Sequence, residues 1–180
     1  MTTAPVTDES SDPLADQVTG EPVAPAADDV RWLDVDQQRH WRAFLVATQM
    51  LNDVLDRQLG DESGLSLAEY EVLVRLSEAP GRTLRMSELA AGLAHSRSRL
   101  SHAVGRMERS GLVARSRCAS DARGVLCTMT DHGWRAIEGA APGHVRAVRA
   151  HLVDVLTDAQ LAALGEAMTA VYDHLSAREA

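Results

Sequence analysis

The spacing of apolar residues along this chain changes at Gly111. Before Gly111, apolar side chains recur every three or four residues, which is the period of an amphipathic helix. After it come two short runs typical of strands, 112–118 and 125–130, joined by the turn-rich segment 119–124. The pattern predicts consecutive helices followed directly by a β-hairpin.

Capping residues mark where the predicted helices begin and end. A long helix is expected over 35–59, and a capping box of Ser66 and Glu69 opens a second helix that the run Ala79-Pro80-Gly81 ends. Two short helices follow at 88–93 and 97–110, with Ser87 and Ser96 as caps and Gly111 in the left-handed position that ends helices. The order helix, short helix, turn, helix, hairpin is that of a winged helix-turn-helix.

The C-terminal third is predicted to be helical again. Thr130 caps a helix that starts at Asp131, which Pro142-Gly143 is expected to break or kink before it resumes over 144–156. A capping box of Thr157 and Gln160 opens a final helix, whose apolar residues form the seam of a helix that packs along another helix. We therefore predict a mainly α fold with a small β-hairpin wing.

Composition agrees with this fold class. Apolar residues make up 45% of the 180 residues but aromatic ones only 3%, so the core must consist mainly of Leu, Val, Ala and Met, which favours helices. No apolar run reaches the roughly 18 to 20 residues of a membrane span, and the N-terminus lacks the features of a signal peptide. The two cysteines cannot form a disulfide framework. We expect a soluble, cytoplasmic protein with no membrane partner.

The net charge of −8 is unevenly distributed along the chain. Residues 1–30 carry seven acids and no base, and their lack of any hydrophobic period predicts a disordered acidic tail. Residues 82–123 carry nine arginines against three acids, a local charge of +6. All eighteen cationic residues are Arg, whose planar fork suits phosphate and guanine.

The predicted helix 97–110 has one polar face. Its small polar side chains and arginines carry donors that can enter a major groove, and its N-terminus offers free amides to a phosphate. The alternative is an ordinary solvated helix face, which the adjacent hairpin makes less favourable. The predicted DNA contacts of this helix are Ser96, Arg97, Ser98, Arg99, Ser101, His102 and Arg106.

The predicted hairpin carries further cations. Arg115 and Arg117 alternate on one face of its first strand, where they can follow a phosphate backbone. Arg123 at the tip can reach a narrow minor groove, where the negative potential is strongest. Asp121 can hold the loop or orient the Arg123 side chain. The alternative for Asp121 and Arg123 is a local salt bridge that contributes little.

Four segments of the chain resemble the multiple antibiotic resistance regulator (MarR) family. They are Leu67-Ala-Glu-Tyr-Glu-Val-Leu-Val-Arg-Leu, Met86-Ser-Glu-Leu-Ala, Arg109-Ser-Gly-Leu-Val and Asp121-Ala-Arg-Gly-Val-Leu-Cys-Thr-Met-Thr-Asp-His-Gly. The last contains the wing signature Asp-x-Arg followed by a strand that ends in Thr-x-x-Gly. The resemblance covers about residues 35–177.

This resemblance implies a homodimeric transcription regulator, most readily a ligand-responsive repressor. Its terminal helices, 31–62 and 131–180, would form the dimerisation region and 63–130 the DNA-binding domain. Two recognition helices would enter successive major grooves of a pseudo-palindromic operator, and the wings would reach the flanking minor grooves. The resemblance places Ser96, Arg97, Ser98 and His102 on bases or phosphates and Arg123 in the minor groove.

Many members of the family respond to small phenolic or other aromatic effectors. The resemblance places such a ligand in a crevice between the dimer helices and the DNA-binding lobe. Trp41 is a candidate for this crevice, and the alternative to a ligand contact is that its side chain belongs to the hydrophobic core. An oxidant-sensing branch uses a cysteine near the start of the first long helix, which this chain lacks, so Cys118 and Cys127 are expected to be inert. The candidate lining residues are Trp32, His40, Trp41, Arg42, Tyr70 and Arg75.

Two other classes of protein are alternatives to a transcription regulator. An enzyme is disfavoured because the sequence has no nucleophile elbow, no glycine-rich phosphate loop and no clustered Cys/His spacing, so we expect no cofactor and no metal. A winged-helix module that dimerises or binds proteins without binding DNA stays open. It is disfavoured because a protein-binding wing does not need nine arginines within 42 residues.

Overall fold

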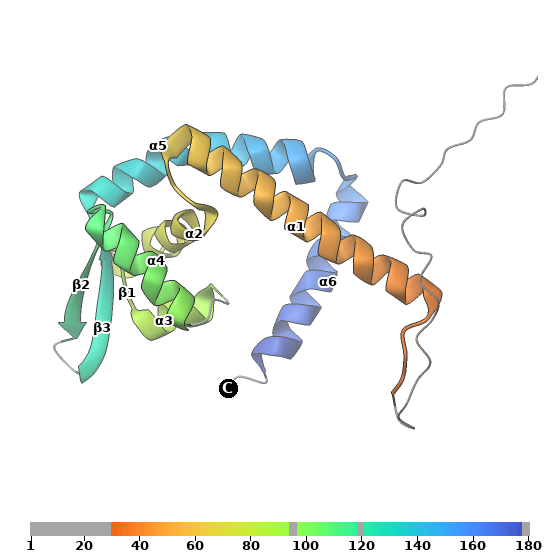
Figure 1. Cartoon of the computed structure of the whole chain (residues 1–180), viewed down its shortest axis with the longest axis horizontal. Coiled ribbons are helices and arrows are strands. Elements are labelled where there is room, and N and C mark those ends of the chain that lie inside the picture. Colours follow the sequence, from red (N-terminus) through yellow and green to blue (C-terminus); the bar gives the residue numbers. More distant parts are fainter. Residues whose placement is uncertain (1–29, 94–96, 119–120, 178–180) are drawn as a thin grey trace, which may run out of the picture. The chain divides into compact units, whose positions relative to one another are not determined.

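The computed structural model describes residues 30–93, 97–118 and 121–177, with residues 97, 99 and 121–123 described by their backbone alone (Figure 1). The chain divides after Gln38 into two units, which we treat separately. In the first, Asp34 and Gln37 form a reciprocal cap: Gln37 N donates to Asp34 Oδ1 (2.8 Å) and Asp34 N donates to Gln37 Oε1 (3.1 Å). The predicted acidic tail lies outside the described residues, apart from Val30.

The structure confirms a mainly helical fold with a winged helix-turn-helix. Two irregular turns interrupt the helices: a 3₁₀ turn at Pro80–Arg82 and a π turn at Arg149–Val153. None of the helices in the described ranges is long and apolar enough to cross a membrane. The helices are α1 (Val35–Ser63), α2 (Leu67–Ser77), α3 (Met86–Gly92), α4 (Arg97–Arg109), α5 (Asp131–Val148) and α6 (Asp158–Ser176).

The wing is part of a three-stranded antiparallel sheet in the order β1-β3-β2. The predicted hairpin is present as β2 (Val113–Cys118) and β3 (Asp121–Met129), with β3 starting four residues earlier than the sequence indicated. The third strand, β1 (Thr83–Arg85), was not predicted; it pairs Leu84 with Cys127 of β3. This sheet joins the start of the helix-turn-helix to the base of the wing.

One apolar core holds α2, α3, α4 and the sheet together. Leu73 and Leu76 of α2, Leu89 of α3, and Val104 and Met107 of α4 are completely buried. Burial of such side chains contributes about 1.5 to 3 kcal/mol each. The orientation of α4 relative to the wing is therefore fixed by packing.

Of the five predicted caps, three are confirmed, one is wrong, and Ser96 lies outside the described residues. Ser66 with Glu69, and Thr157 with Gln160, form complete capping boxes, and Thr130 Oγ1 accepts from Gly133 N (3.0 Å). The predicted cap at Ser87 is wrong, because α3 begins at Met86 and the carboxylate of Glu88 accepts from the backbone N–H of Arg85 (3.0 Å).

Of the break or kink expected at Pro142-Gly143, the break is wrong, since α5 runs through both residues. Gly143 has no room for a Cβ atom, because Glu62 and Gln58 of α1 lie directly against it. Gly143 therefore lies where side chains of α1 reach α5, and a π turn at Arg149–Val153 follows the end of α5.

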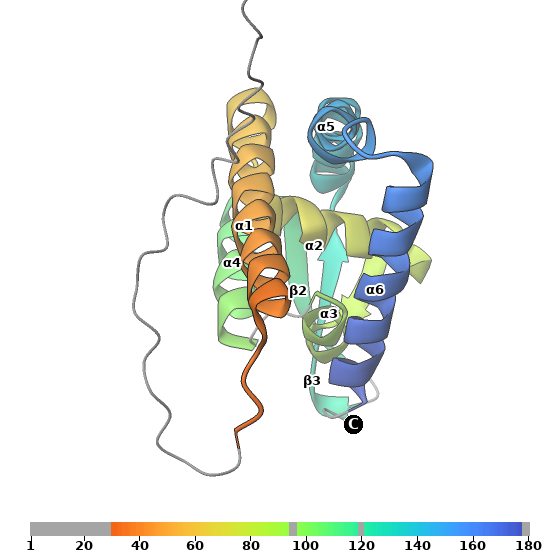
Figure 2. The same cartoon turned by 90° about the vertical axis from the view of Figure 1, so that its right-hand side faces the viewer.

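The N-terminal half of α1 and all of α6 leave apolar side chains uncovered in the single chain. Within α1 only Leu55 and Leu59 are buried, and the rings of Trp41 and Phe44 stack at 5.9 Å on the exposed part. Helix α6 has no buried residue and stands away from α3 and α4 (Figure 1). Figure 2 shows α1 and α6 on opposite sides of the view. The exposed apolar residues of these two helices include Trp41, Phe44, Leu45, Val46, Met50, Met168, Val171, Tyr172 and Leu175.

Candidate nucleic-acid interface

Helix α4 turns one face to the core and one outward. Leu100, Ala103, Val104 and Met107 are between 0% and 5% exposed and pack against α2, α3 and β2. The predicted contact residues Ser98, Ser101 and His102 are all exposed on the other side of the helix. Arg97 and Arg99 belong to α4 by their backbone, whereas Ser96 lies outside the described residues.

The wing is attached to α4 through Arg115. Its guanidinium donates twice to Glu108 Oε2, from Nη2 (2.6 Å) and Nε (2.9 Å), and its backbone N donates to Oε1 (3.1 Å). These bonds hold the pKa of Glu108 below its ordinary value. Arg115, predicted as a phosphate contact, thus has its charge paired within the fold.

Arg117 differs from Arg115 in the pairing of its charge. It is exposed, and no residue in the described ranges pairs with it. Asp121 and Arg123 belong to β3 by their backbone, and their side chains lie outside the description. Arg85, which the sequence reading did not single out, donates from Nη2 to Cys118 Sγ (3.7 Å) and so connects β1 to the end of β2.

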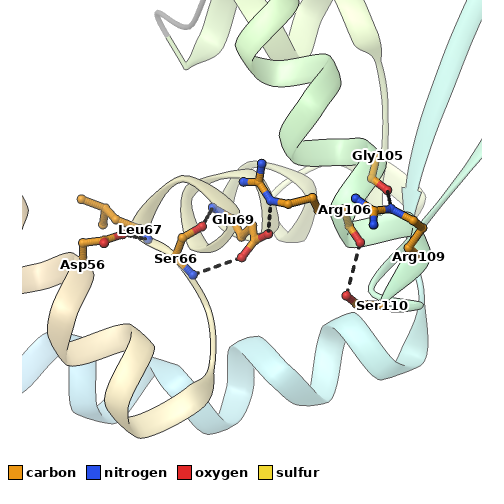
Figure 3. Close-up of polar contacts among 8 residues, drawn as sticks. All are labelled: Asp56, Ser66, Leu67, Glu69, Gly105, Arg106, Arg109 and Ser110. Carbon is orange, nitrogen blue, oxygen red and sulfur yellow. Dashed lines mark hydrogen bonds and ion pairs between the residues drawn. The ribbon is translucent and has the colours of Figure 1, made fainter.

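Two further arginines of the basic segment have partners on neighbouring helices. Arg106, predicted to contact DNA, lies with its Nε 3.4 Å from Glu69 Oε1 of α2 (Figure 3). Arg82 lies 4.0 Å from the centre of the Trp134 ring and 3.5 Å from Asp131. Arg82, Arg106 and Arg115 therefore each have a partner within the fold, whereas Arg117 on the wing has none among the described residues.

A cavity of about 420 Å³ lies between α1, α2, α5 and the end of α3, which we call the α2–α5 cavity. Tyr70 and Arg75, both predicted as ligand residues, line it. Of the other predicted residues, His40, Trp41 and Arg42 are exposed on an earlier part of α1, and Trp32 is exposed in residues 30–38. The cavity is lined by Asn52, Leu55, Leu67, Tyr70, Glu71, Val74, Arg75, Gly92, Leu93 and His144.

His144 has an unusual environment in this cavity. Its ring lies 4.4 Å from that of Tyr70, and its Nδ1 is buried without a hydrogen-bond partner. Burial lowers the pKa of His144, against an opposing effect of Glu71, and raises that of Tyr70. Both amide atoms of nearby Gln58 are also buried without partners. Sequence reasoning missed His144 because Tyr70 and His144 come together only by the packing of α2 on α5.

The described residues contain no cluster of three His, Cys, Asp or Glu side chains that could hold a metal ion. Cys127 is fully buried, and burial raises the pKa of its thiol to about 11, so it is protonated at neutral pH. Cys118 is half-buried beside Arg85.

Comparisons with known proteins agree with this geometry. Residues 63–124 match the family model described as the MarR family. The chain is 46% identical to Sco3205, a MarR family transcriptional regulator from Streptomyces coelicolor whose structure was solved in complex with DNA; the match covers 83% of this chain and 93% of that one, with a TM-score of 0.79. It is 40% identical to AbsC, a MarR family transcriptional regulator from the same organism, over 81% of this chain and 98% of that one, with a TM-score of 0.76.

A more distant structure shares the fold. BpsR from Bordetella bronchiseptica, whose DNA binding is regulated by 6-hydroxynicotinic acid, is 19% identical over 74% of this chain and 98% of that one, with a TM-score of 0.66. The comparison with curated proteins returns no match.

Proposed function

The chain belongs to the MarR family of transcription regulators, and we propose that it is a homodimeric, ligand-responsive repressor that binds a pseudo-palindromic operator in double-stranded DNA. The members of this family regulate transcription and are not enzymes. The observation that carries the proposal is the exposed polar face of α4 beside an arginine-bearing wing, in a chain 46% identical to a regulator solved with DNA.

Helix α4 is the proposed recognition helix. Its donors Ser98, Ser101 and His102 suit base edges and phosphates in a major groove, and Ser96, Arg97 and Arg99 belong to the same proposed surface. Arg117 is proposed to follow the phosphate backbone and Arg123, with Asp121, to enter the minor groove. For Arg115 and Arg106 we propose a positioning role first, because each is paired with a glutamate of the same fold.

A second copy of the chain is the proposed partner of the uncovered apolar faces. Exposed patches of this kind mark interaction sites in proteins. Tyr172 and Leu175 of α6 are 60% and 56% exposed, and Trp41 of α1 is 51% exposed. Pairing of residues 31–62 and 131–180 between two copies would bury both faces. It would also set the two recognition helices about one helical turn of DNA, roughly 10 bp, apart.

The α2–α5 cavity is the proposed effector site, and its volume is in the range of small-molecule sites. The Tyr70 and His144 rings offer flat surfaces to an aromatic or phenolic ligand, and Arg75 offers a cation. Arg75 lies directly over Gly92, at the end of α3. A ligand that draws Arg75 away from Gly92 would act on the end of α3. This would provide a coupling free energy between effector binding and DNA binding.

Fluorescence anisotropy tests the proposed function. The purified protein is titrated onto duplexes from the DNA flanking its own gene and onto shuffled copies, at two salt concentrations. Tight, salt-sensitive binding to one flanking segment and not to its shuffled copy is the expected result. Weak, equal binding to every duplex would favour the module that binds proteins without DNA.

A further inference from the structure

Arg82 has a left-handed backbone, with a φ of 54°, and within the described residues no other residue except glycine has a positive φ. It follows Gly81, whose φ is 60°, in the turn between α2 and β1. A residue with a Cβ atom is strained in this conformation, which glycine adopts freely and asparagine tolerates. Such strain persists only where the surrounding contacts outweigh it. The side chain of Arg82 makes those contacts.

The guanidinium group of Arg82 reaches the first turn of α5. Its central carbon lies 4.0 Å from the centre of the Trp134 ring, and its Nη1 lies 3.5 Å from Asp131 Oδ1. Trp gives the most favourable cation–π pair of the aromatic side chains. The ion pair contributes less, because the Asp131 side chain is 93% exposed and water screens its charge. Trp134 is therefore the main partner of Arg82.

Strand β1 connects Arg82 to the wing. Thr83 of β1 pairs with Thr128 of β3, and the hydroxyl oxygens of the two residues lie 2.9 Å apart. The next pair joins Leu84 to Cys127, which is fully buried. Because these pairs follow Arg82 directly in the chain, the Arg82 side chain links the first turn of α5 to the sheet that carries the wing.

The start of α5 is also attached on a second side, to the turn between α4 and β2. Thr130 Oγ1 donates to Gly111 O (2.7 Å), and Gly133 lies directly against the carbonyl of Leu112. Figure 1 shows α5 starting beside the end of β3 and running away from the wing. A helix held at one point can pivot about it, whereas two attachments fix its direction. The contact of Arg82 supplies the second attachment.

We propose that Arg82 is a positioning residue that fixes the direction in which α5 leaves the winged helix-turn-helix, and so sets the half-site spacing that the dimer accepts. This inference rests on the proposed function, in which residues 131–180 belong to the dimerisation region. In such a dimer, α5 connects each recognition helix to the partner copy. A change in the direction of α5 therefore moves one α4 relative to the other. Arg82 acts through Trp134 and does not touch the DNA.

The alternative role for Arg82 is a direct DNA contact, because it lies in the basic segment 82–123. The structure favours positioning, since the guanidinium already has Trp134 and Asp131 as partners and the Arg82 side chain is only 35% exposed. A phosphate contact would contribute to the affinity for all duplexes alike and to the salt dependence of binding. A positioning residue would instead determine how affinity depends on half-site spacing.

A double-mutant cycle tests the contact without DNA. The full-length variants Arg82→Asn, Trp134→Leu and the double variant are unfolded in urea at one protein concentration. Arg82→Asn removes the guanidinium but keeps a residue that tolerates the left-handed backbone. We expect the two changes to be non-additive by about fivefold in the unfolding equilibrium constant, the size of a partly exposed cation–π contact. Arg82→Lys, which keeps a cation, should retain part of this coupling.

Duplexes with altered half-site spacing test the role in DNA binding. Each base pair added to or removed from the operator centre rotates one half-site by about 35° relative to the other. Wild type should lose about tenfold in affinity per step, and so should Arg135→Gln, a charge-matched control on the exposed side of α5. Arg82→Asn should bind the best spacing more weakly but lose only about two- to threefold per step, because α5 can pivot. Arg82→Lys should lie between the two.

Three results would overturn the inference. The first is additivity of Arg82→Asn and Trp134→Leu in the unfolding cycle, and the second is a spacing profile of Arg82→Asn parallel to that of wild type. The third is an equal loss on operator and shuffled duplexes with a smaller salt dependence, which would make Arg82 a phosphate contact. Failure of wild type to prefer any duplex or spacing would count against the proposed function instead, and the unfolding cycle would still test the contact of Arg82.

Discussion

Glu108 and Arg115 join α4 to the wing through three hydrogen bonds of 2.6 to 3.1 Å. The two residues are seven positions apart and belong to the two elements that are proposed to enter adjacent grooves of DNA. The pair therefore adds a polar link to the apolar packing that orients α4 relative to the wing. Because bonds to Arg115 lower the pKa of Glu108, the carboxylate stays ionised, and the pair intact, at neutral and mildly acidic pH.

Breaking this pair should reduce discrimination between DNA sequences. Glu108→Gln removes a negative charge, so nonspecific affinity should stay constant or rise slightly, while affinity for the operator falls severalfold because the wing is no longer held to α4. Anisotropy on the operator and on a shuffled duplex measures both affinities. Glu138→Gln, an exposed change of the same charge on α5, is the control. Equal changes on the two duplexes would show that the pair does not orient the wing.

Arg123 and Arg97 should have different effects on specificity. Arg123→Ala is expected to weaken binding to many sequences alike and to reduce the salt dependence by about one counterion. Arg97→Ala is expected to cost about 1 to 3 kcal/mol at a single base position if its side chain reads a guanine. Measurement of both variants on a set of single-base operator mutants separates these effects. Unchanged affinity in Arg123→Ala would remove the wing tip from the interface, and an equal loss on specific and random DNA would make Arg97 a phosphate contact.

Two glycines of α5 should respond oppositely to alanine. A Cβ atom at Gly133 would collide with the carbonyl of Leu112 and with Met129, so Gly133→Ala should lower the free energy of unfolding by about 1 to 3 kcal/mol. Gly139 has open space around it within the same helix, and Gly139→Ala should raise the free energy of unfolding by about 0.5 to 1 kcal/mol. Urea unfolding of both variants measures the two changes in the free energy of unfolding. Similar destabilisation in both would contradict the close approach at Gly133.

His144 should make stability depend on pH. Burial lowers its pKa in the folded protein from the ordinary 6.5, so the unfolded chain binds a proton first as the pH falls. Stability is therefore complete above pH 6.5 and declines as the pH falls towards the folded-state pKa. His144→Gln should remove this part of the pH dependence, and His151→Gln, an exposed histidine change, should not. Urea unfolding at pH 7.5 and pH 5.5 would test this; identical pH dependence in wild type and His144→Gln would contradict it.

The sequence predicted those features that depend on local chemistry. Ser66, Thr130 and Thr157 cap helices within three residues of themselves, and Gly111 has the expected left-handed φ of 71°. The strand period of 112–118 correctly indicated the first strand of the wing.

Features that depend on distant contacts could not be predicted. Strand β1 has three residues, too few to show a period, and forms only because β3, some forty residues later, pairs with it. Gly143 of α5 lies against the side chains of Gln58 and Glu62 of α1, a contact that joins two distant parts of the chain. For the interface, the polar face of α4 could be predicted from the sequence. The partners of Arg106 and Arg115 could not, because Glu69 and Glu108 belong to other elements than the arginines they bind.

Hydroxyl-radical footprinting on the operator tests the central claim, that a dimer reads two half-sites through α4. Wild type should protect two segments whose centres lie about one helical turn, roughly 10 bp, apart. His102→Glu, which places a carboxylate on the exposed face of α4, should lose that protection at the same protein concentration. Full protection by His102→Glu, or a single unpaired protected segment with wild type, would contradict the account.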